Sequence, residues 1–199
     1  MQNATTAIPA PLQTLYDAAA NIGMQFEMSP EAVLDYCGLL LEIPPQRNYI
    51  DWCTPRNVLT FATTGGDSVH YSYLVDERLP EGVCPIVMTL PCVYDTLTGP
   101  DGQSVTKALS WVIAESFQEF FDYGYYVGWF SLEQMYYDEQ EGPAYFLQPS
   151  EDFGDIGTQQ LPLLHRALNM KPVPPTLERF AQLQQKYGAL LDIPPMPVD

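Results

Sequence analysis

The sequence predicts an α+β fold, a single domain in which an antiparallel or mixed β-sheet is flanked by N- and C-terminal helices. Three observations lead to this prediction. Apolar residues recur at helical spacing in residues 1–45 and again in residues 160–193. Segments typical of β-strands gather between them, in residues 57–150, together with short helices. These strands do not alternate with helices as in βαβ units, which favours an α+β arrangement.

Two amphipathic helices are expected near the N-terminus. The first has apolar side chains at helical spacing from Leu12 to Ile22, and Gly23 follows as a stop signal. The second begins with Ser29 as its cap, carries Pro30 in its first turn, and ends at Pro44.

A β-hairpin is expected next, in the segment FATTGGDSVHYSYL. The strand Asn57–Thr63 is followed by Gly65 and Gly66, which supply the positive φ angles that a tight turn needs. From Ser68 the residues alternate between two faces of a second strand. One face carries Val69, Tyr71, Tyr73 and Val75, and the other carries Ser68, His70 and Ser72.

Further strands and four helices complete the predicted elements, among them a short edge strand at Tyr145–Leu147. Cys84–Leu90 is a continuous apolar run closed by Pro91, which is typical of a strand buried on both faces. Asp95–Ser104 reads as a loop, and Lys107–Ala114 as another strand. Helices are expected from the capping boxes Ser116–Glu119, with a stop at Gly124, and Ser131–Gln134, and from the periodic segments Leu161–Met170 and Thr176–Leu191.

The charge of the chain excludes some classes of partner. The formal net charge is −17, from 25 acidic and 8 basic residues, which argues against binding to nucleic acid and to anionic membranes. No Lys or Arg lies between Lys107 and Arg166, where ten acidic residues occur. This span is interpreted either as a solvated surface that keeps the protein dispersed or as a surface that attracts a basic partner.

The four cysteines, Cys37, Cys53, Cys84 and Cys92, include no C-x-x-C pair, and the N-terminus lacks the pattern of a signal peptide. We therefore expect reduced thiols in the core of a cytoplasmic protein. No metal site is expected, because the two histidines lie far apart and no Cys/His spacing fits zinc. No cofactor is predicted, since no phosphate-binding or nucleophile motif occurs.

The hairpin is one candidate site. Asp67 and His70 could act as an acid/base pair, but the segment carries no supported nucleophile. An Asp after two glycines is common turn chemistry, and a strand His is usually hydrogen-bonded in place. We therefore interpret Gly65, Gly66, Asp67 and His70 as a structural turn and predict no catalytic residue.

The aromatic residues supply a second candidate. Twelve of the chain's 25 Phe, Tyr and Trp residues lie between Phe117 and Phe146, inside the span without basic residues. Tyr and Trp rimmed by acids are typical of recognition surfaces. The partner-binding face predicted on this ground consists of Tyr125, Tyr126, Trp129, Glu133, Tyr136, Tyr137, Asp138 and Glu139.

The residues from about Asn57 to Trp129 resemble the SUKH superfamily, in particular its bacterial members with a Gly-Gly-Asp turn followed by Val-His-Tyr/Phe-Ser. The resemblance implies an α+β fold without enzymatic activity, and it implies immunity proteins that neutralise toxin domains or, among eukaryotic relatives, scaffolds. The superfamily implies no catalytic residues. The matching positions are Phe61, Ala62, Thr64, Gly65, Gly66, Asp67, Val69, His70, Pro85, Ile86, Val87, Met88, Pro91, Phe117, Phe120 and Phe121.

Three functions follow from these observations. The first is a non-enzymatic protein-binding domain, an immunity or adaptor protein, that engages a basic partner such as a toxin domain through the acidic, tyrosine-rich face. The second is a hydrolase-like enzyme at the Gly-Gly-Asp hairpin. The third is a structural homodimer with the aromatic face buried between two copies.

Overall fold

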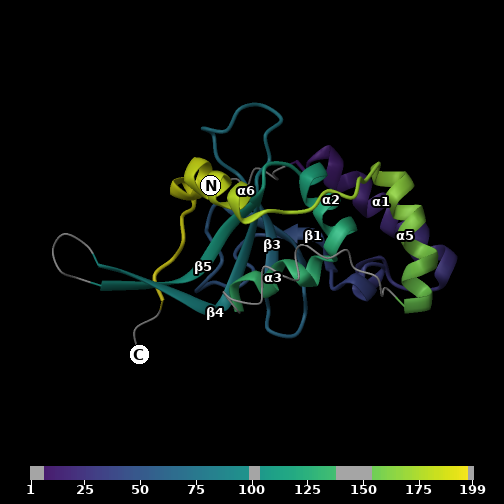
Figure 1. Ribbon diagram of the computed structural model, residues 1–199, viewed down its shortest axis with the longest axis horizontal. Helices are drawn as coiled ribbons and strands as arrows, with labels where there is room; N and C mark the ends of the chain where they lie inside the picture. The colour runs from purple at the N-terminus through teal and green to yellow at the C-terminus, as the bar shows by residue number, and fades with distance from the viewer. Residues whose placement is uncertain (1–6, 99–103, 138–153, 197–199) are drawn as a thin grey trace.

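The computed structural model describes residues 7–98, 104–137 and 154–196, which form an α+β fold around one five-stranded antiparallel sheet (Figure 1). The strands follow each other across the sheet in chain order, so each pairs with its sequence neighbour as in a meander. The predicted α+β class is confirmed. The short edge strand expected at Tyr145–Leu147 lies outside the residues that the structure describes. The strands are β1 (Leu40–Gln46), β2 (Val58–Thr63), β3 (His70–Leu74), β4 (Ile86–Thr98) and β5 (Ser104–Ala114).

The first predicted helix is present as α1 (Ala10–Phe26), which runs past Gly23 and ends at Glu27. Glu27 adopts a left-handed conformation there, with φ 55°. Gly23 is needed for packing instead, because a Cβ on it would lie 2.7 Å from the carbonyl oxygen of Met28. The chain therefore folds back closely over the last turn of this helix.

The prediction of a second helix between Ser29 and Pro44 is wrong. Pro30–Ala32 and Asp35–Cys37 form two short 3-10 helices, and β1 follows directly. Gly38 ends the second of these with a φ of 72°, and a Cβ on it would lie 2.3 Å from the Cβ of Phe130. The segment turns tightly at this contact and pairs with β2, so sheet pairing overrides the helical spacing of its apolar residues.

One face of the sheet packs against α2 (Phe117–Val127) through aromatic side chains. The rings of Phe61, Tyr71 and Tyr73 lie 5.0 to 5.7 Å from those of Phe117 and Phe120. All five side chains are buried. Each large apolar side chain removed from water in this way stabilises the fold by roughly 1.5 to 3 kcal/mol.

The opposite face of the sheet is also buried, but it carries polar side chains. The hydroxyls of Thr60 and Ser72 lie 2.8 Å apart, and those of Thr89 and Ser110 lie 3.1 Å apart. His70 belongs to the same face, opposite Thr89 in the register of β3 and β4. The predicted alternation of β3 is thus present, and cross-strand hydrogen bonds satisfy its polar side as burial requires.

The strands β4 and β5 form a long two-stranded arm that extends beyond the rest of the sheet (Figure 1). Pro91 does not end β4 as predicted, because the strand continues through an irregularity between Leu90 and Tyr94, where a proline is tolerated. The predicted loop Asp95–Ser104 is wrong at both ends. Thr96 and Thr106 pair across the arm with hydroxyls 3.2 Å apart, and the ladder continues to the pair Thr98 and Ser104.

The helix α2 begins as its sequence predicts, since the Ser116 hydroxyl accepts a hydrogen bond from the Glu119 N–H at 3.2 Å. The predicted stop at Gly124 is wrong. The helix continues to Gly128, whose φ of 78° ends it, and α3 (Trp129–Tyr137) follows directly. Gly124 makes room for the indole of Trp129, because a Cβ there would lie 1.9 Å from Cε2 of that ring.

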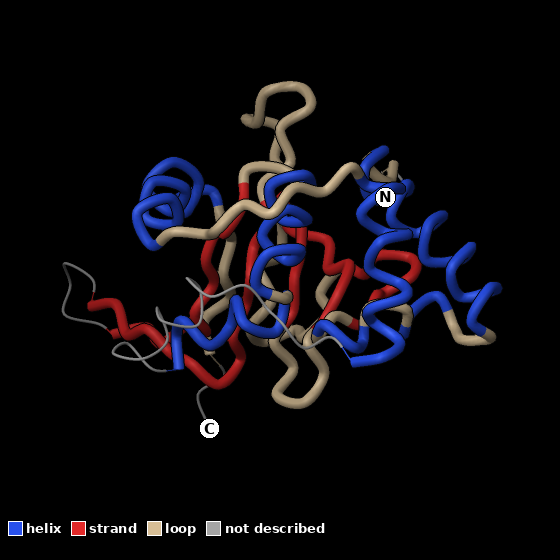
Figure 2. Tube along the Cα trace, turned by 45° about the vertical axis from the view of Figure 1, so that its right-hand side comes forward, coloured by secondary structure: helices blue, strands red, loops and turns tan. Residues whose placement is uncertain are grey.

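Two helices from the C-terminal part of the chain cover different regions. α5 (Gly154–Leu168) lies beside α1 in both views of the chain (Figures 1 and 2). It begins seven residues before the expected start at Leu161, so Pro162 lies inside the helix. α6 (Leu177–Tyr187) packs along β5 and starts at Thr176, whose hydroxyl accepts from the Arg179 N–H as an N-cap.

Both outer edges of the sheet are covered or interrupted. At β5 the outward N–H of Val112 donates to the Gln184 side chain of α6 at 3.0 Å. Farther along β5, the N–H of Met196 donates to the Thr106 carbonyl at 2.8 Å. At the other edge, β1 contains Pro44 and Pro45, which have no backbone N–H.

Candidate functional site

The tip of the β2–β3 hairpin is held by hydrogen bonds across its turn. The Thr64 N–H donates to the Val69 carbonyl at 2.9 Å, and the Thr63 hydroxyl donates to the same oxygen at 2.8 Å. The positive φ angles lie at Gly65 (100°) and Ser68 (64°). The sequence predicted them at Gly65 and Gly66, so the turn is wider than expected and ends one residue before Val69.

His70 is fully buried and uses both ring nitrogens inside the fold. Nδ1 lies 2.9 Å from the Ser68 carbonyl, which can only accept, so Nδ1 carries the proton. Nε2, 3.0 Å from the Thr54 hydroxyl, then accepts, and that hydroxyl accepts in turn from the Ile50 N–H. Burial lowers the pKa of His70 to about 4, which agrees with a neutral ring.

His70 therefore does not join Asp67 in a cavity. Its ring supports Ser68, the left-handed residue of the turn, from the polar side of the sheet, while Asp67 is exposed at the tip. The hydrogen bond to Ser68 links the buried histidine to the position of the adjacent Asp67.

Glu133 is the carboxylate that the fold brings to the hairpin. It projects from α3, is only 1% exposed, and accepts a hydrogen bond from the Thr64 hydroxyl at 2.8 Å. The predicted capping box at Ser131 is wrong, because α3 begins at Trp129 and Glu133 lies in the body of the helix. Burial, with the nearby charge of Asp67, raises the pKa of Glu133 to about 7.

The two carboxylates line one open cavity of about 440 Å³, which we call the hairpin-tip cavity. The Phe130 side chain forms part of its wall and is 49% exposed, an exposure that Tyr94 alone shares among the described aromatic side chains. The cavity combines negative charge with an apolar ring, and none of the described residues that line it is basic. Its lining residues are Gly66, Asp67, Phe130, Glu133 and Gln134.

The predicted partner-binding face is only partly where the sequence placed it. Trp129 is a core residue, 1% exposed, whose indole N–H donates to the Phe120 carbonyl at 3.2 Å. Glu133 is equally buried, so neither residue lies on an exposed face. Tyr125 is half-buried and stacks on His165 with ring centroids 4.9 Å apart, and Tyr126 is half-buried as well.

The other four predicted face residues lie partly or wholly outside the described residues. Tyr136 and Tyr137 belong to α3, but their side chains lie outside the described residues, as do Asp138 and Glu139 entirely. Phe130 was not predicted as a binding residue. Helical spacing could have indicated it, because Trp129, Leu132 and Glu133 share the buried side of α3 and Phe130 falls outside that stripe.

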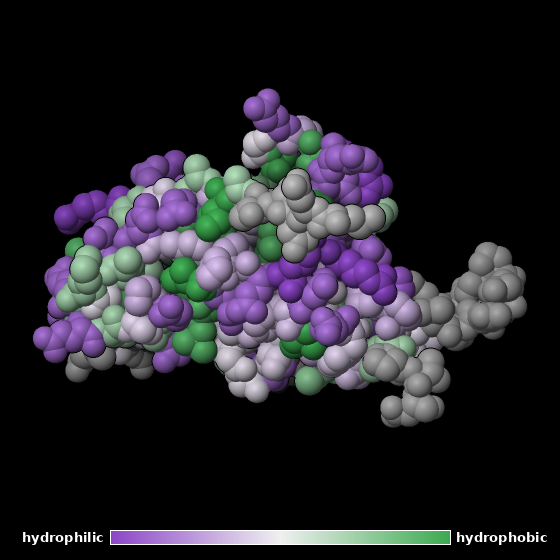
Figure 3. Space-filling view, turned by 180° about the vertical axis from the view of Figure 1, so that it is seen from behind, coloured by the Kyte–Doolittle hydropathy of each residue, from purple (hydrophilic) through white to green (hydrophobic). Residues whose placement is uncertain are grey.

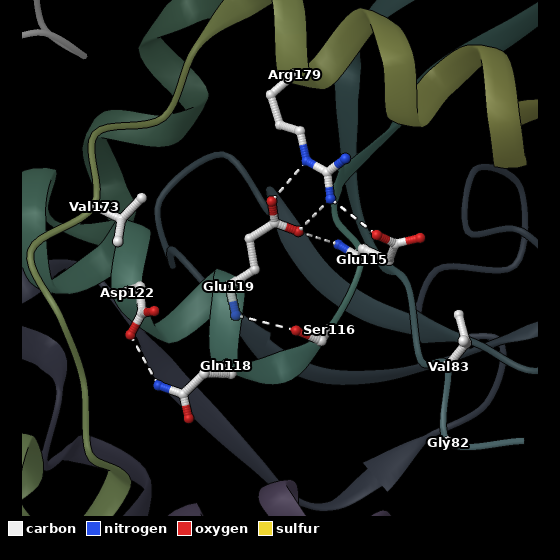
Figure 4. A pocket seen from close by; sticks show the side chains of 9 residues that line it. All are labelled: Gly82, Val83, Glu115, Ser116, Gln118, Glu119, Asp122, Val173 and Arg179. Carbon is white, nitrogen blue, oxygen red and sulfur yellow. Dashed lines mark hydrogen bonds and ion pairs between the residues drawn. The ribbon is translucent and has the colours of Figure 1, made fainter.

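A second cavity, of about 480 Å³, lies where α6 meets α2 (Figure 4). Its charged groups are already paired with each other. Arg179 donates from Nε to Glu119 at 2.8 Å and from Nη2 to Glu115 at 3.0 Å. Lys186 and Tyr187 donate to Glu115 as well, and these hydrogen bonds lower the pKa of its carboxyl to about 2. This cluster fastens α6 to the sheet and to α2.

The cysteines differ in burial more than the sequence predicted. All four are free thiols, but only Cys37 and Cys53 are buried, Cys84 is half-buried, and Cys92 is exposed. Among the described residues, no three His, Cys, Asp or Glu side chains form a group that could hold a metal ion. Within the same residues, no helix has the length and apolar character needed to cross a membrane.

Comparison of the chain with protein-family models, with curated proteins and with solved structures finds no match. The resemblance to the SUKH superfamily therefore stays a prediction.

Proposed function

We propose that this chain is a non-enzymatic protein-binding domain that engages a basic protein partner through the surface around the hairpin-tip cavity. The observation that carries the proposal is the cavity itself, where Asp67, Glu133 and the half-exposed Phe130 face one opening. An aromatic ring bordered by carboxylates favours cationic side chains, and charge complementarity steers such a partner toward the site.

The charge of the whole chain supports the proposal. The net charge is −17, and four of the eight basic residues form ion pairs with carboxylates elsewhere in the described chain. None of these four lines the hairpin-tip cavity, so they do not neutralise its carboxylates. A partner of this kind would have a positively charged surface, as a nuclease-type toxin or another anion-binding protein has. The roles implied by the family resemblance, immunity or adaptor protein, agree with such an interaction.

The test is capture of a partner followed by measurement of its affinity. The wild-type chain, the double variant Asp67→Asn/Phe130→Ala and the control Glu31→Gln are immobilised and exposed to lysate of the source cells and to the product of the adjacent gene. Glu31→Gln removes the same charge as Asp67→Asn from an exposed residue outside the cavity. The captured protein is then purified, and its Kd is measured at low and at high NaCl concentration.

We expect a partner with a net positive charge whose Kd rises about tenfold or more between about 50 and about 300 mM NaCl. The double variant should lose about tenfold in affinity, since it removes a carboxylate and an aromatic contact, while the control stays within about twofold. A Kd that does not change with NaCl concentration, or a partner without net positive charge, would contradict the proposal.

A second candidate function is acid–base chemistry at the same cavity. The observation that favours it is that Glu133, whose pKa is raised to about 7, lines the same cavity as a second carboxylate, Asp67, because a carboxyl group with a pKa near neutrality is suited to proton transfer. Catalytic turnover of a substrate, rather than stoichiometric binding, would distinguish this function. The pair differs from the Asp67 and His70 pair that the sequence suggested.

The homodimer alternative depends on an exposed aromatic face. On the side of the molecule seen in Figure 3, hydrophilic residues interrupt the apolar ones, and the described residues there form no wide apolar area. Sedimentation velocity of the purified chain distinguishes a homodimer from a monomer.

A further inference from the structure

We propose that the hairpin-tip cavity receives the side chain of one lysine, with its ammonium group between Asp67 and Glu133 and its methylene stem along Phe130. This inference rests on the proposed function and deepens it, because it names the group of the basic partner that enters the site.

The shape and charge of the cavity suit a single cationic side chain. Its volume of about 440 Å³ lies toward the lower end of the range for small-ligand pockets. Two carboxylates enter it from different elements, Asp67 from the hairpin turn and Glu133 from α3, and no basic residue lines it. A cation placed there meets negative charge from two sides.

The hydrogen bonds of Glu133 favour an ammonium over a guanidinium. A guanidinium binds best through two parallel N–H···O bonds to both oxygens of one carboxylate. In Glu133, Oε2 already accepts from Thr64 at 2.8 Å, and Oε1 lies 3.4 Å from the Gln134 amide nitrogen. An ammonium is a compact charge with three donors, so it can take one oxygen from each of the two carboxylates.

Phe130 supplies the apolar part of the site. Its ring is 49% exposed at the cavity wall, although most aromatic side chains in the described chain are buried or half-buried. A lysine covers such a surface with its methylene stem while its charged end stays polar, and an ammonium near the ring face gains a cation–π attraction.

The burial of Glu133 couples this binding to pH. Among the described residues, Asp67 is the charged group that raises its pKa, while the hydrogen bonds from Thr64 and Gln134 oppose the rise. An incoming ammonium favours the ionised carboxylate. Because the pKa lies at about 7, most chains must release a proton at pH 6 to bind, whereas few must do so at pH 8.

The experiment is a titration of the ¹⁵N-labelled protein with Nα-acetyl-lysine N-methylamide at constant ionic strength, followed by NMR. We expect saturable shifts of the Gly66, Asp67 and Gln134 amides, with a Kd that is up to about tenfold lower at pH 8 than at pH 6. The norleucine analogue, which has the stem without the charge, should cause no such shifts. Asp67→Asn should weaken binding about tenfold and Glu31→Gln should leave it unchanged, and each variant spectrum reports whether the chain is folded.

Three outcomes would overturn the inference: no shifts at these amides, equal shifts with the norleucine analogue, or tighter binding of Nα-acetyl-arginine N-methylamide in a parallel titration. The failure of the proposed function is distinct from these. If a basic partner binds in a salt-dependent manner but the lysine analogue causes no shifts of the amide signals, the proposed function is supported and the lysine site is refuted. If the lysine analogue binds but no basic protein partner is found, the lysine site is supported and the proposed function is refuted.

Discussion

Glu133 and His70 are both buried, and burial moves their pKa values in opposite directions. It raises the pKa of the Glu133 carboxyl to about 7 and lowers that of the His70 imidazole to about 4, because in each case the charged form loses hydration. Between these values both side chains are neutral. The region around the hairpin therefore buries no full charge from these two residues in mildly acidic solution.

Replacing Glu133 tests this directly. Between pH 4.5 and about 7 the folded chain keeps a proton on Glu133 that the unfolded chain releases, so the stability that this residue contributes falls as pH rises through that window. Glu133→Gln keeps an acceptor for the Thr64 hydroxyl and carries no charge. We expect the variant to match the wild type near pH 4.5 and to be more stable at pH 8 by about 1 to 3 kcal/mol, as measured by urea denaturation. A difference in stability that is the same at both pH values would refute the assignment.

Single residues at the site were predictable only where local chemistry decides them. Ser116 caps α2, as its capping box predicts, because a hydroxyl before a helix has nearby N–H groups to accept from. The contact between Thr64 and Glu133 joins residues 69 positions apart, and no local pattern specifies it. Glu133 was expected on an exposed face because acidic residues are rarely buried.

At the scale of helices and strands, the two predictions that failed most clearly concern competition between local and tertiary preferences. The segment expected as the second helix has helical spacing, yet it forms two 3-10 helices and, after the turn at Gly38, continues as β1, which pairs with β2. The segment Asp95–Ser104 has turn residues at its centre, yet threonines on both sides extend the ladder toward them. Periodicity and turn signals indicate which structure is locally accessible, and the partner strand decides which one forms.

Gly124 offers a test in which two effects have opposite signs. Glycine inside a helix costs about 1 kcal/mol relative to alanine, so propensity alone predicts that Gly124→Ala stabilises α2. A Cβ at this position would lie within 2.3 Å of three indole atoms of Trp129, whose ring is enclosed in the core. We expect a loss of about 2 to 4 kcal/mol, since overpacking displaces the indole.

The measurement is urea denaturation with tryptophan fluorescence, which also reports the environment of the indole. Gly66→Ala serves as the control, because a Cβ there meets no atom within 4 Å. A stabilised Gly124→Ala would show that helix propensity outweighs the packing of Trp129.

Across the whole molecule, the excess of acidic residues should make stability depend on salt. A chain with a net charge of −17 repels itself in the compact state, and added salt screens that repulsion. The ion pairs of Arg179 with Glu115 and Glu119 are weakened by the same screening, but they are few. We expect the Tm to rise by about 2 to 4 °C, or roughly 1 kcal/mol, between about 20 and about 500 mM NaCl. Sorbitol at equal osmolality is the control, and a Tm that falls with NaCl would contradict the argument.

The fold class was predictable because it depends on the order of elements, which periodicity reveals. The sheet order was not, because it depends on which strands meet, and the covering of β5 by α6 depends on contacts between Val112 and Gln184 that are 72 positions apart. The candidate site has the same origin. Its two halves, the hairpin and α3, were each noted in the sequence, but only the folded chain joins them.

The covered and interrupted edges of the sheet affect how readily the protein forms fibrils at high concentration. An open sheet ordinarily presents two rows of backbone donors and acceptors on which other chains can polymerise into amyloid-like fibrils. Here Pro44 and Pro45 interrupt one row, while α6 and the segment around Met196 occupy parts of the other. Growth by strand addition at β5 would first require the ion pairs of Arg179 to break, so resistance to fibril formation in this molecule depends on a polar cluster some distance from the strand it protects.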